Sequence, residues 1–217
     1  MDMAIGDTSK SKTGKLILSL GLGAIAGFFG AMGFMRLIDS GALGEFTTSQ
    51  EIAGLVGLIY ILTTLAVIVG LISPALGARF LNVEDADELR EQRLMLGWSA
   101  LGMIAMGVAL VLAAIGAPGG PIAPSVTLVA VILLVAIGWF AGLRQRRHTD
   151  ELMTSVTKEA TCFAFYLTFL LGGGWALLAH VEYTAAPQPL DWLTMFAGFL
   201  LIASFIAAGK RGMLVQR

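Results

Sequence analysis

The chain has 217 residues, of which 57% are hydrophobic and 13% charged, and its formal net charge is -1. A soluble domain carries about 25% charged residues, so about half of the usual solvating charge is missing. The charges are clustered, which leaves uncharged stretches of about 20 residues, each long enough as a helix to cross a hydrocarbon core of about 30 Å. Composition therefore excludes a soluble globular protein and predicts an integral membrane protein.

Six apolar segments predict membrane-spanning helices, at residues 16–36, 52–76, 94–116, 122–143, 159–180 and 190–209. None alternates polar and apolar residues with the period of two expected of a barrel strand, so the predicted fold class is an all-α polytopic bundle. We expect an N-terminal tail (1–15), a membrane domain (16–209) and a C-terminal tail (210–217). The single cysteine, Cys162, excludes an internal disulfide.

The first apolar segment also resembles a signal peptide, since three lysines precede it and Ala24-Ile25-Ala26 has the form of a cleavage site. The apolar run continues to Met35, however, which is too long for the 7–15 residues of a signal-peptide core. We therefore expect an uncleaved first helix.

Basic residues divide the connections into two sets. One set holds all but one of the fourteen basic residues, namely Lys10, Lys12, Lys15, Arg79, Arg90, Arg93, Arg144, Arg146, Arg147, Lys158, Lys210, Arg211 and Arg217. The other set holds only Arg36. The positive-inside bias then predicts three in-out-in hairpins with both termini in the cytoplasm. Tryptophans near both predicted membrane surfaces agree with these spans: Trp98, Trp139, Trp175 and Trp192.

The tripeptide Asp-Glu-Leu occurs twice, at 87–89 and at 150–152, each time just before a long apolar segment. Acidic side chains at these positions can accept hydrogen bonds from free backbone N–H groups and favour the positive end of the helix dipole. We expect Asp85 or Asp87 to cap the third spanning helix and Asp150 to cap the fifth. The repeat fits either a duplicated hairpin or an unrelated series of similar hairpins.

The stretch TDELMTSVTKEATCFAFY resembles a pattern in small, uncharacterised bacterial multi-pass membrane proteins. That pattern has Asp-Glu-Arg, a charged residue and an alanine six to ten positions on, and aromatic residues entering the membrane. The matching residues here are Asp150, Glu151, Lys158, Ala160, Phe163 and Phe165, whereas Leu152 departs from the usual arginine. The resemblance covers about 18 of the 217 residues. It implies a bacterial inner (plasma) membrane protein and no particular activity.

Small residues suggest where helices approach one another. Gly23 and Gly27 form a small-xxx-small stripe on the first helix, and Gly138 and Gly142 form another on the fourth. Such stripes allow close backbone approach in lipid. They fit either contact with a partner helix or ordinary packing inside the bundle. Pro74 should kink the inner end of the second helix.

The spans hold no ionisable residue near their centres. Arg36 and Asp39, three positions apart at the outer end of the first helix, can pair and anchor it at the membrane surface, or alternatively form a gate. The deepest polar groups are hydroxyls: Tyr60, Thr63, Thr64, Tyr166 and Thr168. They could line a small polar pocket if their helices face each other, or the threonines could bond to carbonyls four residues earlier.

The sequence offers no recognisable catalytic or cofactor site. His148 and His180 are expected on opposite sides of the membrane, so they cannot share a haem or a zinc ion. We find no phosphate-binding glycine loop and no nucleophile with an adjacent base. Basic residues close to the membrane suit anionic lipid headgroups better than nucleic acid. We therefore expect neither an enzyme, nor a cofactor, nor a nucleic-acid partner.

Two classes of function fit these features. The first is a non-catalytic component of a membrane complex with an accessory, assembly or regulatory role, in contact with the bilayer and with another membrane protein or a second copy of itself. The alternative is a small-solute or lipid transporter or channel, which six spans and a hydroxyl-lined pocket would serve.

Overall fold

The computed structural model describes the backbone of residues 5–80, 86–116 and 120–213, and the side chains of 21–78, 86–116 and 120–213. Within these ranges the chain is helical and contains no strand. Six helical segments are long and apolar enough to cross a membrane: Gly21–Asp39, Thr48–Ile72, Arg93–Ile115, Pro124–His148, Glu151–His180 and Pro189–Lys210. The predicted all-α class with six candidate spans is confirmed, and these spans fit a multi-pass membrane protein.

The long helices are α1 (Ile5–Asp39), α2 (Thr48–Ile72), α5 (Arg93–Ile115), α6 (Pro124–Gln145), α7 (Glu151–Leu167) and α9 (Pro189–Lys210). A π-helical turn, η2 (Thr168–Gly172), joins α7 to α8 (Gly173–His180). The other short elements are α3 (Pro74–Phe80), α4 (Ala86–Glu91) and the 3-10 turn η1 (Arg146–His148). Because α1 already begins at Ile5, most of the expected N-terminal tail belongs to this helix.

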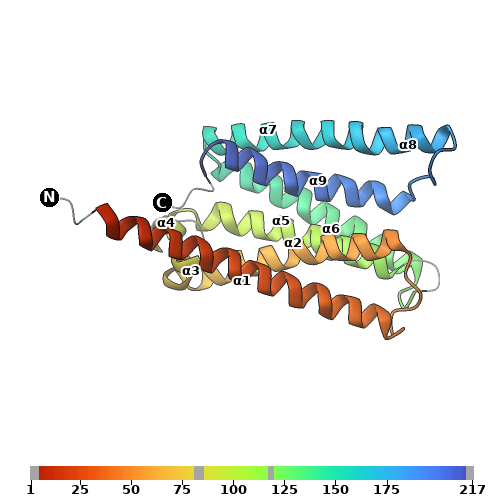
Figure 1. Cartoon of the computed structure of the whole chain (residues 1–217), viewed down its shortest axis with the longest axis horizontal. Helices are drawn as coiled ribbons and strands as arrows, with labels where there is room; N and C mark the ends of the chain where they lie inside the picture. Colours follow the sequence, from red (N-terminus) through yellow and green to blue (C-terminus); the bar gives the residue numbers. More distant parts are fainter. Residues whose placement is uncertain (1–4, 81–85, 117–119, 214–217) are drawn as a thin grey trace.

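The long helices run side by side along the long axis of the molecule (Figure 1). Helix α5 lies at the centre and packs against α2, α6 and α9, while α9 also packs against α2 and α7. Helix α1 lies at the edge and contacts α2 and α3. Although α6 and α7 are consecutive in the chain, they do not share a packed face. This leaves α6 supported mainly by α5, and α7 mainly by α9.

The two sets of connections lie at opposite ends of the bundle (Figure 1). One end carries α3, α4, η1 and the last turn of α9, and we call it the basic end because Arg90, Arg144 and Lys210 close its helices. The opposite end carries the α1–α2 and α8–α9 connections, and Arg36 lies in the last turn of α1 there. The predicted segregation of basic residues is therefore also a segregation in space among the described residues.

Small residues form the interior of the bundle. Gly57 of α2 and Gly107 of α5 lie directly opposite each other: a Cβ on Gly57 would be 2.7 Å from the Gly107 carbonyl oxygen, and one on Gly107 would be 2.8 Å from the Gly57 carbonyl oxygen. No side chain fits at either position. Buried alanines continue this close packing on α5, at Ala100, Ala105, Ala109 and Ala114. Close backbone approach supplies the dispersion contacts that the hydrophobic effect cannot supply between helices in lipid.

The proline near the end of the second spanning helix has a larger effect than the predicted kink. Helix α2 ends at Ile72, and Pro74 is the first residue of α3. Proline has no backbone N–H and disfavours helical geometry in the preceding residue, so it starts a helix more readily than it continues one. Helix α3 then folds back so closely that a Cβ on Gly77 would lie 2.6 Å from the Cα of Gly70.

The two Asp-Glu-Leu tripeptides have different roles. Asp150 caps α7 as predicted, because its carboxylate accepts a hydrogen bond from the backbone N–H of Met153 at 2.7 Å. The prediction for Asp87 was wrong: it lies in the first turn of α4 and forms an ion pair with Arg90, whereas the N-cap of α5 is Gln92. The chain starts a separate helix at the first tripeptide, so its acidic groups serve α4. Asp85 lies outside the described residues.

Candidate functional site: a groove along α6 and polar clamps at both ends

The five hydroxyls singled out in the sequence do not come together. The Tyr60 hydroxyl is buried and donates to the backbone carbonyl of Ala197 on α9 at 2.8 Å. The threonine hydroxyls each donate to the carbonyl four residues earlier, at Thr63, Thr64 and Thr168. Tyr166 is exposed on α7. The predicted pocket required α2 to face α7, but α9 packs between these two helices.

The predicted glycine stripes are mostly open. A Cβ on Gly23, Gly27 or Gly142 would meet nothing within 4 Å, and one on Gly138 would lie 3.8 Å from the carbonyl oxygen of Gly102 on α5. Helix α1 approaches α2 more closely at Gly30, where a Cβ would be 3.0 Å from the Leu62 side chain. Toward the basic end, the described chain therefore leaves room for a side chain at both Gly23 and Gly27.

Arg36 and Asp39 are both exposed, and no ion pair joins them in the part of the chain that the structure describes. A different set of polar contacts holds that end together. The buried Ser49 hydroxyl at the start of α2 donates to the Asp191 carboxylate at the start of α9, at 2.5 Å. The Gln50 side-chain amide donates to the carbonyl of Ala114 at the end of α5, at 2.8 Å.

These two contacts tie three spanning helices at their ends, and sequence reasoning missed them. The only local signals are capping boxes, one with Thr47 and Gln50 at the start of α2 and one with Gln188 and Asp191 at the start of α9. A capping box predicts a helix start, but it does not tell which other helix the polar side chains will reach.

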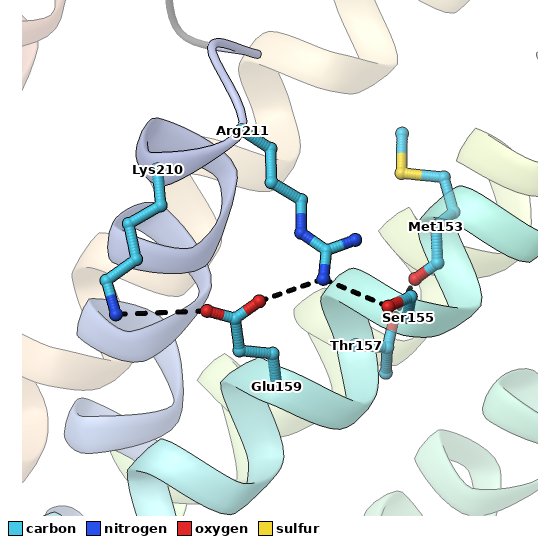
Figure 2. Close-up of polar contacts among 6 residues, drawn as sticks. All are labelled: Met153, Ser155, Thr157, Glu159, Lys210 and Arg211. Atoms are coloured by element: carbon cyan, nitrogen blue, oxygen red, sulfur yellow. Dashed lines mark hydrogen bonds and ion pairs between the residues drawn. The ribbon is translucent and has the colours of Figure 1, made fainter.

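A second clamp joins α7 and α9 at the basic end. The Arg211 guanidinium donates to the Glu159 carboxylate and to the Ser155 hydroxyl, each at 2.9 Å (Figure 2). The Lys210 ammonium lies 3.8 Å from the other Glu159 oxygen and 5.6 Å from the centre of the Phe163 ring. Buried alanines lie next to this clamp in the packed face of α7 and α9, at Ala160, Ala164, Ala203 and Ala207. The clamp therefore fixes the ends of two helices that also pack through small side chains.

A groove of about 380 Å³ runs along α6 and has its floor on α5. Gly102, Gly138 and Gly142 line it, and their missing side chains leave the hollow. Met103 and the buried Tyr60 also line it. At the basic end the lining becomes polar, with Ser99, Gln145 and Arg146. The groove is thus apolar over most of its length and has a cation at one end.

The described residues offer no other recognisable chemistry. No three His, Cys, Asp or Glu side chains among them lie close enough together to hold a metal ion. His148 closes η1 at the basic end, and His180 closes α8 at the opposite end. A scan against protein-family models, a search of curated proteins and a search of solved structures each found no match to this chain.

Proposed function

We propose that this protein is a non-catalytic integral membrane component with an accessory, assembly or regulatory role, and that α1 is its contact with a neighbouring membrane protein. The observation that carries the proposal is the uneven packing of the spanning helices. Helix α1 is the least buried of the six candidate spans, and α5 is the most buried.

The glycines of this chain serve different purposes inside and outside the bundle. Gly57 and Gly107 are used for a close contact between helices of the same chain. Gly23 and Gly27 have the same potential for close approach, but a Cβ added at either position would meet nothing within 4 Å. Because two helices in lipid gain little from apolar side chains alone, an open glycine face suits a partner helix.

We further propose that the basic end faces the cytoplasm of a bacterial cell, with both chain termini on that side of the inner membrane. The positive-inside bias supports this orientation, because the basic loops are short and close to the spans. Contact with the bilayer and with a partner helix then accounts for the exposed apolar side chains of the bundle. The proposed role requires no nucleic acid, metal ion or cofactor.

The test is capture of the tagged full-length protein from its native membrane in mild detergent, comparing wild type with Gly27→Leu. Gly33→Leu is the matched control, because Gly33 also contacts nothing within 4 Å. At about 100° per residue, Gly33 points about 120° away from Gly27 around the helix. We expect a protein at fixed ratio to be captured with wild type and Gly33→Leu and to be lost with Gly27→Leu. Capture that is the same for all three would refute the α1 contact, and capture of only a second copy would replace the partner by a homo-oligomer.

The second candidate function is a transporter or channel, for a lipid rather than a small solute. The groove along α6 favours the lipid, because its lining is mostly apolar, whereas the hydroxyls that a solute would need are bonded to backbone carbonyls. The purified protein in vesicles should show no solute uptake and no lipid movement above protein-free vesicles if the first proposal holds. Flux by the protein alone would favour the second.

A further inference from the structure

The groove along α6 has the shape of a site for one extended chain. Val135, Gly138, Gly142 and Arg146 all line it, and their spacing of three, four and four residues places them along one face of the helix. From Val135 to Arg146 the groove spans about 16 Å at 1.5 Å per residue, against about 15 Å for the hydrocarbon of one leaflet. With Arg146 at the membrane surface, a groove of this length would reach to about the midplane.

The groove has a positive charge at the end where the phosphate of a phospholipid would lie. Arg146 lines the end of the groove at the membrane surface, and no described carboxylate forms an ion pair with it. Arg144 and Arg147 lie on either side of it in the chain and are likewise without an ion pair among the described residues. A guanidinium forms strong, often bidentate hydrogen bonds with phosphate oxygens.

The side chains around the groove suit an acyl chain. Met103 and Met106 contribute flexible, polarisable thioethers that adapt to irregular apolar ligands. Trp139 also lines the groove, with 73% of its surface exposed, and its ring offers a large apolar surface to such a chain. The Tyr60 hydroxyl on the floor is already bonded to Ala197, so it places no unsatisfied polar group against the chain.

We propose that this groove binds a single anionic glycerophospholipid from the leaflet at the basic end, with one acyl chain along α6 and the phosphate at Arg146. The inference goes beyond the proposed function and does not depend on α1 or on a protein partner. Helix α5 packs against both α6 and α9, and a bound lipid would fill the space that is left between those two helices.

The test is native mass spectrometry of the delipidated full-length protein titrated with dioleoylphosphatidylglycerol, with dioleoylphosphatidylcholine as the comparison lipid. Wild type should bind one phosphatidylglycerol in preference to phosphatidylcholine. Arg146→Gln should weaken phosphatidylglycerol binding by about tenfold, because a charge-assisted contact to phosphate is lost. Arg147→Gln removes the same charge at a residue that does not line the groove. It should weaken phosphatidylglycerol binding by about fivefold at most, which is the effect of one basic residue near an anionic surface.

A second pair of variants tests the acyl-chain half of the site. Gly142→Leu should abolish the binding of both lipids, because its side chain fills the groove from a position where a Cβ meets nothing within 4 Å. Gly33→Leu makes the same change in open space on α1 and should leave binding unchanged. Wild-type binding by Gly142→Leu would overturn the proposal, as would equal effects of Arg146→Gln and Arg147→Gln. Loss of a copurifying protein from Gly142→Leu with unchanged lipid binding would assign the groove to a partner helix instead.

Discussion

At the scale of single residues, a polar clamp joins spanning helices at each end of the bundle. At one end the buried Ser49 bonds to the partly buried Asp191, and at the other end Glu159 bonds to Arg211 where solvent reaches both groups. The two clamps look alike as hydrogen bonds, but water competes much more strongly with the second. The difference in burial decides which clamp contributes more to stability.

We therefore predict that Ser49→Ala lowers the free energy of unfolding by about 1–2 kcal/mol, since a hydrogen bond to a charged group is lost at a buried position. Glu159→Gln should cost about 0.2–1 kcal/mol, and less at high salt, because exposed ion pairs are screened. The measurement is the unfolding midpoint in detergent against denaturant, with Ser125→Ala at an exposed position as the control. A larger loss for Glu159→Gln than for Ser49→Ala would contradict this ranking.

At the scale of elements, the tightest contact is the crossing of α2 and α5 at Gly57 and Gly107. The neighbouring atoms there are backbone carbonyl oxygens, which cannot move without moving the helix. The glycines along α6 have no such constraint at Gly142. Helix packing therefore requires glycine at Gly57 and Gly107, whereas at Gly142 glycine only keeps the groove open.

Gly107→Ala should destabilise the protein by about 1–3 kcal/mol, because overpacking outweighs the gain in helix propensity. Gly142→Ala should be neutral or stabilising by up to about 1 kcal/mol, because alanine favours the helix and nothing opposes its Cβ. Unfolding of the two variants under one set of conditions checks the difference in sign. Two variants of equal stability would show that α2 and α5 do not cross so closely.

The sequence predicts the helices well because each span is long, apolar and ended by recognisable residues. It predicts the Asp150 cap because that interaction is local. It cannot tell which helices are neighbours, because each span carries apolar residues on all of its faces. The face that packs inside the bundle therefore looks like the face that meets lipid. For this reason the predicted pocket, which required α2 beside α7, is absent from the described residues, and nothing in the sequence distinguishes Gly57 and Gly107 from the other glycines among the 27 of the chain. The groove could not be predicted because it depends on how α6 lies against α5 and apart from α9.

At the scale of the whole molecule, the bundle is polarised: the described basic residues, Arg36 apart, gather at one end. In a Cys162→Ser background, His148→Cys should react with a membrane-impermeant thiol reagent only in inverted vesicles, because η1 lies at the basic end. Tyr183→Cys, in the connection between α8 and α9 at the opposite end, should react in intact cells. Labelling of both from the same side would rule out the proposed orientation.

Above all, we propose that the protein acts through another membrane protein and not by chemistry or transport of its own. The most direct measurement is the mass and composition of the particle extracted from the native membrane in mild detergent. We expect the 22.8 kDa chain together with a second, different polypeptide at fixed stoichiometry. A particle that contains this chain alone, and that moves lipid or solute across vesicle membranes by itself, would contradict it.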